Sequence, residues 1–225
     1  MSSKYVKILI GLIIGAAVGL VAKEFNLSTF KYGILLALVA VIVTLIYTLT
    51  LIRKQKKLNE KVLPSFDLLE KGNVDEFIKI NEKYLAEEKD SLSQLKIIMF
   101  LISGYDIKKD FETPRRLLLE LDEKSLPKQA RVVYNASLAM VSFKAGHVED
   151  AIKIMEDNKK VFDRFDGVYN DVGIIIAYSR ILEYSNKMEY EKALALIEKI
   201  RSQMGEKSFE EEYKLIKKAL KESKK

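Results

Sequence analysis

The stretch of chain that decides the fold runs from residue 132 to residue 161 and reads VVYNASLAMVSFKAGHVEDAIKIMEDNKKV. Apolar residues recur every three or four positions on both sides of Gly146, which is the pattern of amphipathic helices. Gly146 begins the segment GHVEDAI, in which a turn is followed by renewed helical spacing. The stretch therefore predicts two helices joined by a turn at Gly146.

Three other segments resemble this turn: GNVDEFI from residue 72, DFETPRR from residue 110 and MEYEKAL from residue 188. The apolar anchors of the four segments are separated by 37, 37 and 42 positions, and they are Val74, Phe111, Val148 and Tyr190. This spacing is typical of stacked helical hairpins, which must stack because one hairpin cannot bury its apolar face alone. From residue 58 onward helical spacing continues without strand-like alternation, so we predict an all-α fold.

At this point the chain resembles the tetratricopeptide repeat (TPR) family, whose helices cross at small residues and whose turn follows a glycine. The third unit carries the resemblance through Leu138, Ala139, Gly146, Val148, Ala151 and Met155. The fourth unit keeps Tyr184, Tyr190, Ala193 and Ile197. It departs from the family at Arg180 and Ile181, and the first two units depart at Phe77 and Pro114.

The resemblance implies a TPR-like α-solenoid of about four helix pairs over residues 58–223. Residues 207–223 are expected to form a C-terminal capping helix, with apolar residues at helical spacing: Phe209, Tyr213, Ile216 and Leu220. Thr113 is the expected N-cap of a helix that starts at Pro114.

In TPR proteins the first helix of each hairpin lines an inner groove that commonly binds extended peptides or partner helices. Carried over position by position, the resemblance implies ten candidates for binding a protein or peptide partner: Lys96, Met99, Ser103, Ala136, Met140, Phe143, Lys144, Tyr178, Leu182 and Asn186. The two lysines are the stronger candidates, because the apolar residues are expected to pack inside the stack. Such a mixed surface suits a peptide with apolar anchors and an acid.

The chain begins with two uncharged runs, of 15 residues at 8–22 and of 20 residues at 33–52. As a helix rising about 1.5 Å per residue, the second run spans roughly the 30 Å hydrocarbon core of a bilayer. We predict a membrane anchor of two transmembrane helices over residues 5–53, forming a hairpin. The alternative is that the first run belongs to a cleaved signal peptide.

Basic residues predict the orientation of this anchor. They follow the second run as Arg53, Lys54, Lys56 and Lys57, and they precede the first run as Lys4 and Lys7. Both termini should therefore face the cytoplasm in a two-pass protein of the cell membrane, with the basic flank against anionic lipids. On the first helix, Gly11, Gly15 and Gly19 would allow close packing, either with the second helix or with another protein.

Charge and composition exclude several classes of protein. The first 57 residues hold eight basic side chains and one acidic one, whereas the other 168 hold 30 basic and 31 acidic, so no nucleic-acid-binding face is expected. With no Cys and one His, the chain predicts no disulfide, no metal site and no cofactor. We expect His147 to be an exposed turn residue, and we expect no catalytic residues and no enzyme activity.

These patterns favour a membrane-tethered scaffold that recruits a protein partner to its cytoplasmic repeats. A structural subunit, assembled through the glycine-bearing helix, is the second hypothesis. An unrecognised enzyme or enzyme regulator is the third.

Overall fold

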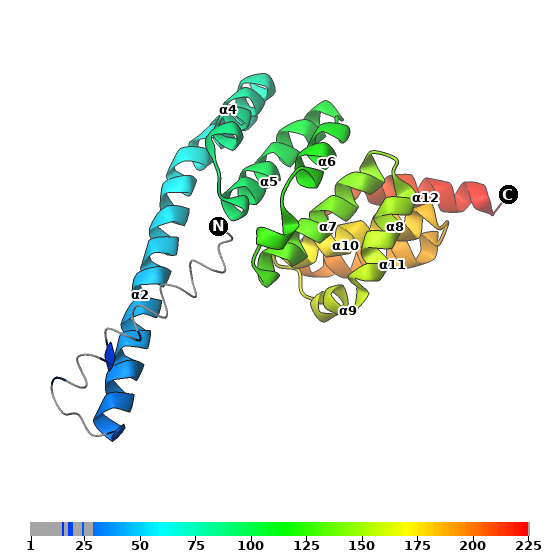
Figure 1. Ribbon diagram of the computed structural model, residues 1–225. Coiled ribbons are helices and arrows are strands. Elements are labelled where there is room, and N and C mark those ends of the chain that lie inside the picture. The colour runs from blue at the N-terminus through cyan, green and yellow to red at the C-terminus, as the bar shows by residue number, and fades with distance from the viewer. Residues whose placement is uncertain (1–14, 16–17, 20–23, 25–28, 225) are drawn as a thin grey trace. The chain divides into compact units, whose positions relative to one another are not determined.

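The computed structural model describes residues 15, 18–19, 24 and 29–224 of the chain (Figure 1). Within these residues the regular elements are α-helices and short 3-10 helices, with no β-strand, so the predicted all-α class is confirmed. The chain divides into two compact units, residues 1–60 and residues 61–225.

The longest helix is α2, Thr29–Val62. Between residues 34 and 62 the sequence has neither Gly nor Pro, so nothing interrupts the backbone hydrogen bonds of the helix. The helix ends where Pro64 enters the 3-10 turn η1, Leu63–Ser65, which is the break expected from the sequence.

One helix of the described part is long and apolar enough to cross a membrane, judged by length and composition. It includes the second uncharged run, and none of its most apolar 18-residue window is buried. The first uncharged run, including Gly11, lies outside the described residues except for positions 15, 18 and 19. The first of the two predicted membrane helices therefore lies mostly outside the described residues.

The helices of the second unit follow one another closely along the chain. In order they are α3 Phe66–Glu70, α4 Val74–Glu87, α5 Ser91–Lys108, α6 Glu112–Leu119, α7 Lys128–Lys144, α8 Val148–Asp157, α9 Lys159–Phe162, α10 Asp171–Asn186, α11 Tyr190–Met204 and α12 Glu210–Ser223, with the 3-10 turns η2 Glu123–Ser125 and η3 Asp163–Phe165. Each of the four predicted turns lies between two helices: α3 and α4, α5 and α6, α7 and α8, and α10 and α11.

The four turns share one backbone geometry. A left-handed residue ends the first helix of each pair: Gly72 (φ 78°), Lys109 (φ 58°), Gly146 (φ 86°) and Met188 (φ 58°). The N–H group of the next residue then donates to a carbonyl five positions earlier, in the bonds Asn73 to Leu68 (2.7 Å), Asp110 to Tyr105 (3.0 Å), His147 to Ser142 (2.9 Å) and Glu189 to Tyr184 (2.8 Å). This is the 6→1 bond of a Schellman cap, so the sequence repeat is also a repeat of backbone conformation.

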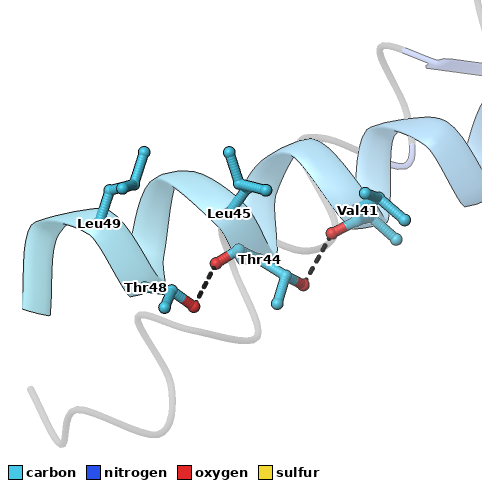
Figure 2. A pocket seen from close by; sticks show the side chains of 6 residues that line it. Val41, Thr44, Leu45, Thr48 and Leu49 are labelled. Carbon is cyan, nitrogen blue, oxygen red and sulfur yellow. Dashed lines mark hydrogen bonds between the residues drawn. The ribbon is translucent and has the colours of Figure 1, made fainter. Parts of the chain in front are cut away.

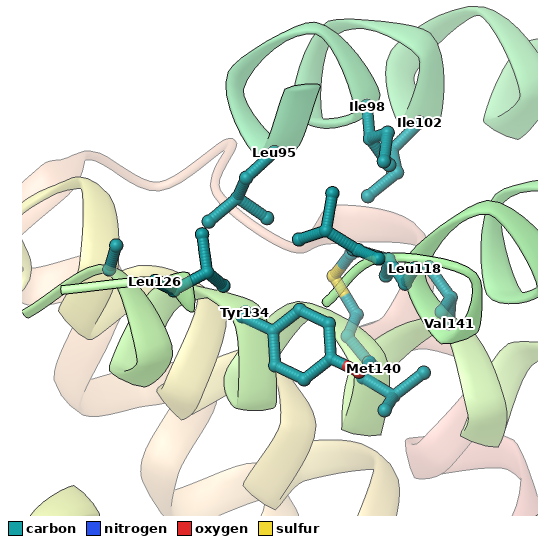
Figure 3. Close-up of a cluster of buried hydrophobic side chains, with 11 residues drawn as sticks. Leu95, Ile98, Ile102, Leu118, Leu126, Tyr134, Met140 and Val141 are labelled. Carbon is teal, nitrogen blue, oxygen red and sulfur yellow. The ribbon is translucent and has the colours of Figure 1, made fainter. Parts of the chain in front are cut away.

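Neighbouring helices of the second unit pack on one another. The contacting pairs are α4 with α5, α5 with α6, α6 with α7, α7 with α8, α7 with α10, α10 with α11 and α11 with α12. One core cluster joins α5, α6 and α7 through buried side chains that include Leu95, Leu118 and Tyr134 (Figure 3). Burial of each such side chain stabilises the fold by about 1.5–3 kcal/mol.

Small residues lie where helices come closest. Ala139 and Ala151, on the two helices of the third pair, are fully buried in one cluster, and Ala193 is fully buried in the next. On α5, a Cβ at Gly104 would lie 2.8 Å from the Phe77 ring of α4. The absence of a side chain at Gly104 therefore lets α4 and α5 approach closely.

Helices α12 and α6 correspond to two helices expected from the sequence. α12 forms within the predicted range of the capping helix, and Ile216 is buried in the cluster that also contacts Phe209 and Tyr213. The helix expected to start at Pro114 begins at Glu112 instead. The Asp110 carboxylate accepts from the Thr113 N–H (3.1 Å), and Pro114 falls in the first turn, where amides lack helical partners.

Candidate partner-binding surface

The three candidate residues on α5 lie on one face, because their spacing is i, i+3 and i+7. Ser103 is exposed, whereas Met99 is half-buried against the core and accepts a hydrogen bond at its sulfur from Ser137 Oγ (3.0 Å). Burial lowers the pKa of the Lys96 amino group, so its charge is partly desolvated. Of the three, Ser103 is the most accessible to a partner.

The three apolar candidates on α7 are core residues. Ala136, Met140 and Phe143 are 0%, 9% and 6% exposed. Ala136 and Phe143 pack with α8 and α10, and Met140 packs with α5 and α6. In this structure they stabilise the stack of helices, as the sequence predicts for apolar groove positions.

Lys144, at the end of α7, joins three segments of the chain. Its Nζ lies 2.6 Å from Asp106 Oδ1 on α5, and its side chain is only 18% exposed. The same ammonium lies 4.8 Å from the ring centroid of Phe111 and 5.1 Å from that of Tyr178. An ion pair and two cation–π contacts therefore hold this lysine, and a ligand would have to compete with Asp106 for its charge.

The candidates on α10 differ in accessibility. The Tyr178 hydroxyl donates to Glu212 on α12 (2.7 Å), and its ring lies 5.1 Å from that of Phe209. Burial raises the pKa of Tyr178, and the hydrogen bond to Glu212 raises it further. Leu182 is half-buried against the core, and Asn186 is exposed. The C-terminal helix thus contacts one end of the predicted groove.

Some of the ten candidate residues are in contact with one another, and two of them are exposed to solvent. Lys144 and Tyr178 are in direct contact, while Met99, Met140, Tyr178 and Leu182 share one apolar cluster. Ser103 and Asn186 are the two exposed candidates.

No protein-family model, curated protein or solved structure matches this chain.

Arg180, which departs from the TPR pattern, has a structural partner in the turn before α10. Its guanidinium lies 2.9 Å from Asp163 and also pairs with Asp166, and its side chain is 17% exposed. The pairs attach η3 to α10. The Arg180 guanidinium is therefore occupied by carboxylates of the same protein. It attaches the connection between the third and fourth helix pairs to α10.

A second surface, which sequence reasoning missed, is a depression of about 540 Å³ beside the first half of α7. Its lining residues are Glu123, Lys128, Gln129, Arg131, Val132, Asn135, Asn158, Val161, Arg164 and Phe165. They come from three separate parts of the sequence, η2, α7 and residues 158–165, so no local motif marks the site.

No three His, Cys, Asp or Glu side chains of the described residues are grouped so that they could hold a metal ion. His147 lies in the turn before α8, as expected from the sequence, and its Nε2 is 2.7 Å from Glu112 Oε1. The pair links two neighbouring turns.

On α2, large apolar side chains are exposed at many positions of the uncharged run. Val41, Leu45 and Ile46 are 60%, 58% and 59% exposed. Thr44 and Thr48 hydroxyls donate to carbonyls four residues earlier (2.8 Å each), as Figure 2 shows for a shallow pocket on this helix. These bonds satisfy the hydroxyls internally, as an apolar environment requires.

Proposed function

We propose that this protein is a membrane-tethered scaffold whose helical repeats recruit a protein partner. The observation that carries the proposal is the unburied apolar face of α2, which continues without a break into a basic segment. A soluble protein rarely leaves so long an apolar surface exposed. A lipid bilayer is the environment that this helix fits.

The module that α2 tethers is, on this proposal, a TPR-like α-solenoid of about four helix pairs with α12 as its cap. The repeated Schellman turns and the buried alanines Ala139, Ala151 and Ala193 support the resemblance. Stacked repeats of this kind present an extended surface for a partner. Binding, and not catalysis, is the activity that such a surface supports.

The proposed topology is a two-pass anchor in the cell membrane, with both termini in the cytoplasm. The basic flank of α2 supports this orientation, because Arg53, Lys54, Lys56 and Lys57 are exposed at its cytoplasmic end. In contact with anionic headgroups, each of them contributes about 1 kcal/mol. Gly11, Gly15 and Gly19 would pack the first helix against the second.

A second candidate function is that of a structural subunit of a membrane complex. It is favoured if the glycine-bearing helix, and not the repeat module, makes the essential contact. The two functions differ in which part of the chain holds the partner, so one experiment separates them.

That experiment is affinity capture of the tagged full-length protein from its native membrane after crosslinking. It compares three forms: the native chain, a chain with scrambled apolar runs, and Ser103→Arg with Asn186→Arg on the exposed candidates. Ser202→Arg, at an exposed site on α11, is the matched control.

The scaffold function predicts that a reproducible partner is still captured by the chain with scrambled apolar runs and by Ser202→Arg. The same partner should not be captured by the double variant Ser103→Arg with Asn186→Arg. Loss on scrambling alone would instead establish the structural-subunit function. Absence of any partner enriched over a membrane-protein control would overturn both.

A further inference from the structure

The depression beside α7 is lined by an excess of positive charge. Three cations line it, Lys128, Arg131 and Arg164, against one carboxylate, Glu123. Of the six arginines in residues 61–225, four pair with carboxylates: Arg115, Arg116, Arg180 and Arg201. In that described part of the chain, the two arginines without such a pair both line this depression.

Arg131 is held in place by backbone carbonyls. Its Nε donates to the Leu126 carbonyl (3.0 Å), and one terminal nitrogen donates to the Lys124 carbonyl (3.1 Å). These bonds fix the guanidinium without neutralising its charge. A positioned arginine with free charge is suited to a carboxylate, which it can bind through two parallel hydrogen bonds.

The start of α7 adds to the positive field of the depression. α7 follows Pro127 without a side-chain cap, and its first turn holds no acidic residue. Its first amides therefore present partial positive charge beside Lys128 and Arg131. This contribution is secondary to that of the three cationic side chains.

Of the other six lining residues, three are apolar and three carry side-chain amides. Val132, Val161 and Phe165 are half-buried, and Val132 and Phe165 also pack against a core cluster. The Asn135 amide donates to Asn158 Oδ1 (3.1 Å), which ties α7 to the start of α9. The wall is thus fixed, and it offers room for one bulky apolar side chain.

We propose that this depression binds an acidic peptide segment of a partner protein, with one apolar side chain inserted and flanking carboxylates on Arg131, Arg164 and Lys128. The volume lies within the range of about 300–1,000 Å³ that ligand sites occupy. A bilayer surface cannot enter a concave site. This inference rests on the proposed function and names the chemistry of the partner.

The test uses a labelled synthetic pentapeptide that has a central leucine with two glutamates on each side. Its fluorescence anisotropy is measured as full-length protein in neutral detergent is added. We expect saturable binding that weakens with salt. The double variant Lys128→Glu with Arg164→Glu should weaken binding about tenfold or more, because both charges reverse at the site. Arg164→Lys should retain most of the affinity.

The matched control places the same charge changes on α12, as Lys217→Glu with Lys221→Glu. Circular dichroism of each variant separates lost binding from lost folding. Equal weakening by the control pair would reduce the interaction to general electrostatics and overturn the proposal. Equal binding of a peptide with glycine in place of leucine would also overturn the proposal. Displacement of the peptide by phosphatidylglycerol micelles that act through the same residues would overturn it as well.

The same double variant, used in the membrane capture experiment, distinguishes this inference from the proposed function. Peptide binding that depends on Lys128 and Arg164, without any captured partner, supports the site and contradicts the scaffold function. A partner captured equally by the native chain and the double variant, with no peptide binding, supports the scaffold and overturns the site.

Discussion

Gly104 is a residue whose lack of a side chain sets the distance between two helices. An alanine there would gain helix propensity of about 1 kcal/mol in an open helix. Here the new Cβ would meet the Phe77 ring at 2.8 Å and Ile78 at 2.9 Å, and Phe77 is fully buried. We therefore predict that Gly104→Ala lowers the free energy of unfolding by about 1–3 kcal/mol.

Chemical denaturation followed by circular dichroism measures this effect. Ser103→Ala is the matched control, because it lies one position away on the exposed side of α5 and should change stability by less than about 0.5 kcal/mol. Equal stabilities of the two variants would contradict close packing at Gly104.

At the scale of elements, the turns between paired helices are strained in two of the four cases. Met188 adopts the left-handed conformation that glycine occupies at Gly146, and its side chain is 75% exposed, so little packing holds it there. A non-glycine residue in the left-handed conformation costs about 1–2 kcal/mol. Glycine avoids this cost but loses more conformational entropy on folding, so the net gain is smaller. We predict that Met188→Gly raises the free energy of unfolding by about 0.5–1 kcal/mol.

The reciprocal substitution provides the control for this prediction. Gly146→Ala places a side chain at φ 86°, with nothing within 4 Å of its Cβ, so strain alone acts. Its unfolding free energy should fall by about 1 kcal/mol. If Met188→Gly and Gly146→Ala changed the free energy of unfolding in the same direction, the left-handed turn conformation would not be what determines their stability.

The contact between α10 and α12 predicts a dependence of stability on pH. An unfolded tyrosine loses its proton near pH 10, whereas burial and the bond to Glu212 raise the pKa of folded Tyr178. Above about pH 10 the folded state therefore binds more protons than the unfolded state. The stabilisation is complete below that pH and is lost as the pH rises, so unfolding becomes easier.

Thermal unfolding between about pH 8 and about pH 11 tests this linkage. Tyr178→Phe should reduce the fall in melting temperature over this range, and Glu212→Gln should reduce it in part, because it removes the negative charge. Identical pH profiles for the native chain and Tyr178→Phe would show that this hydroxyl does not contribute.

The elements predicted well from the sequence are those set by local signals. Val74, Val148 and Tyr190 begin helices because an apolar anchor follows a turn, and this pattern lies within a few residues. Lys109 and Met188 take the left-handed position without any glycine to indicate it. The ion pairs of Arg180 join residues 14 and 17 positions apart, and the lining of the depression beside α7 comes from residues between 123 and 165. Helical periodicity does not report such contacts.

At the scale of the whole molecule, basic charge and apolar length occur together at the N-terminal end of the chain. Residues 1–57 carry a net charge of +7, and the rest of the chain carries −1. A two-pass anchor, as proposed, would use this asymmetry to keep both termini inside the cell, because lysine and arginine remain on the cytoplasmic side. A single-pass anchor after a cleaved leader keeps the C-terminal module on the same side.

The chain has no cysteine, so single introduced cysteines report this topology without background labelling. For a two-pass protein, a membrane-impermeant maleimide should label Ser28→Cys in intact cells, because it lies between the apolar runs. Ser3→Cys and Ser202→Cys should react only after permeabilisation. A cleaved leader predicts instead that the mature protein lacks the Ser3→Cys label under all conditions, while Ser202→Cys stays protected. Labelling of Ser202→Cys in intact cells would place the repeats outside the cell and contradict the positive flank as the determinant of orientation.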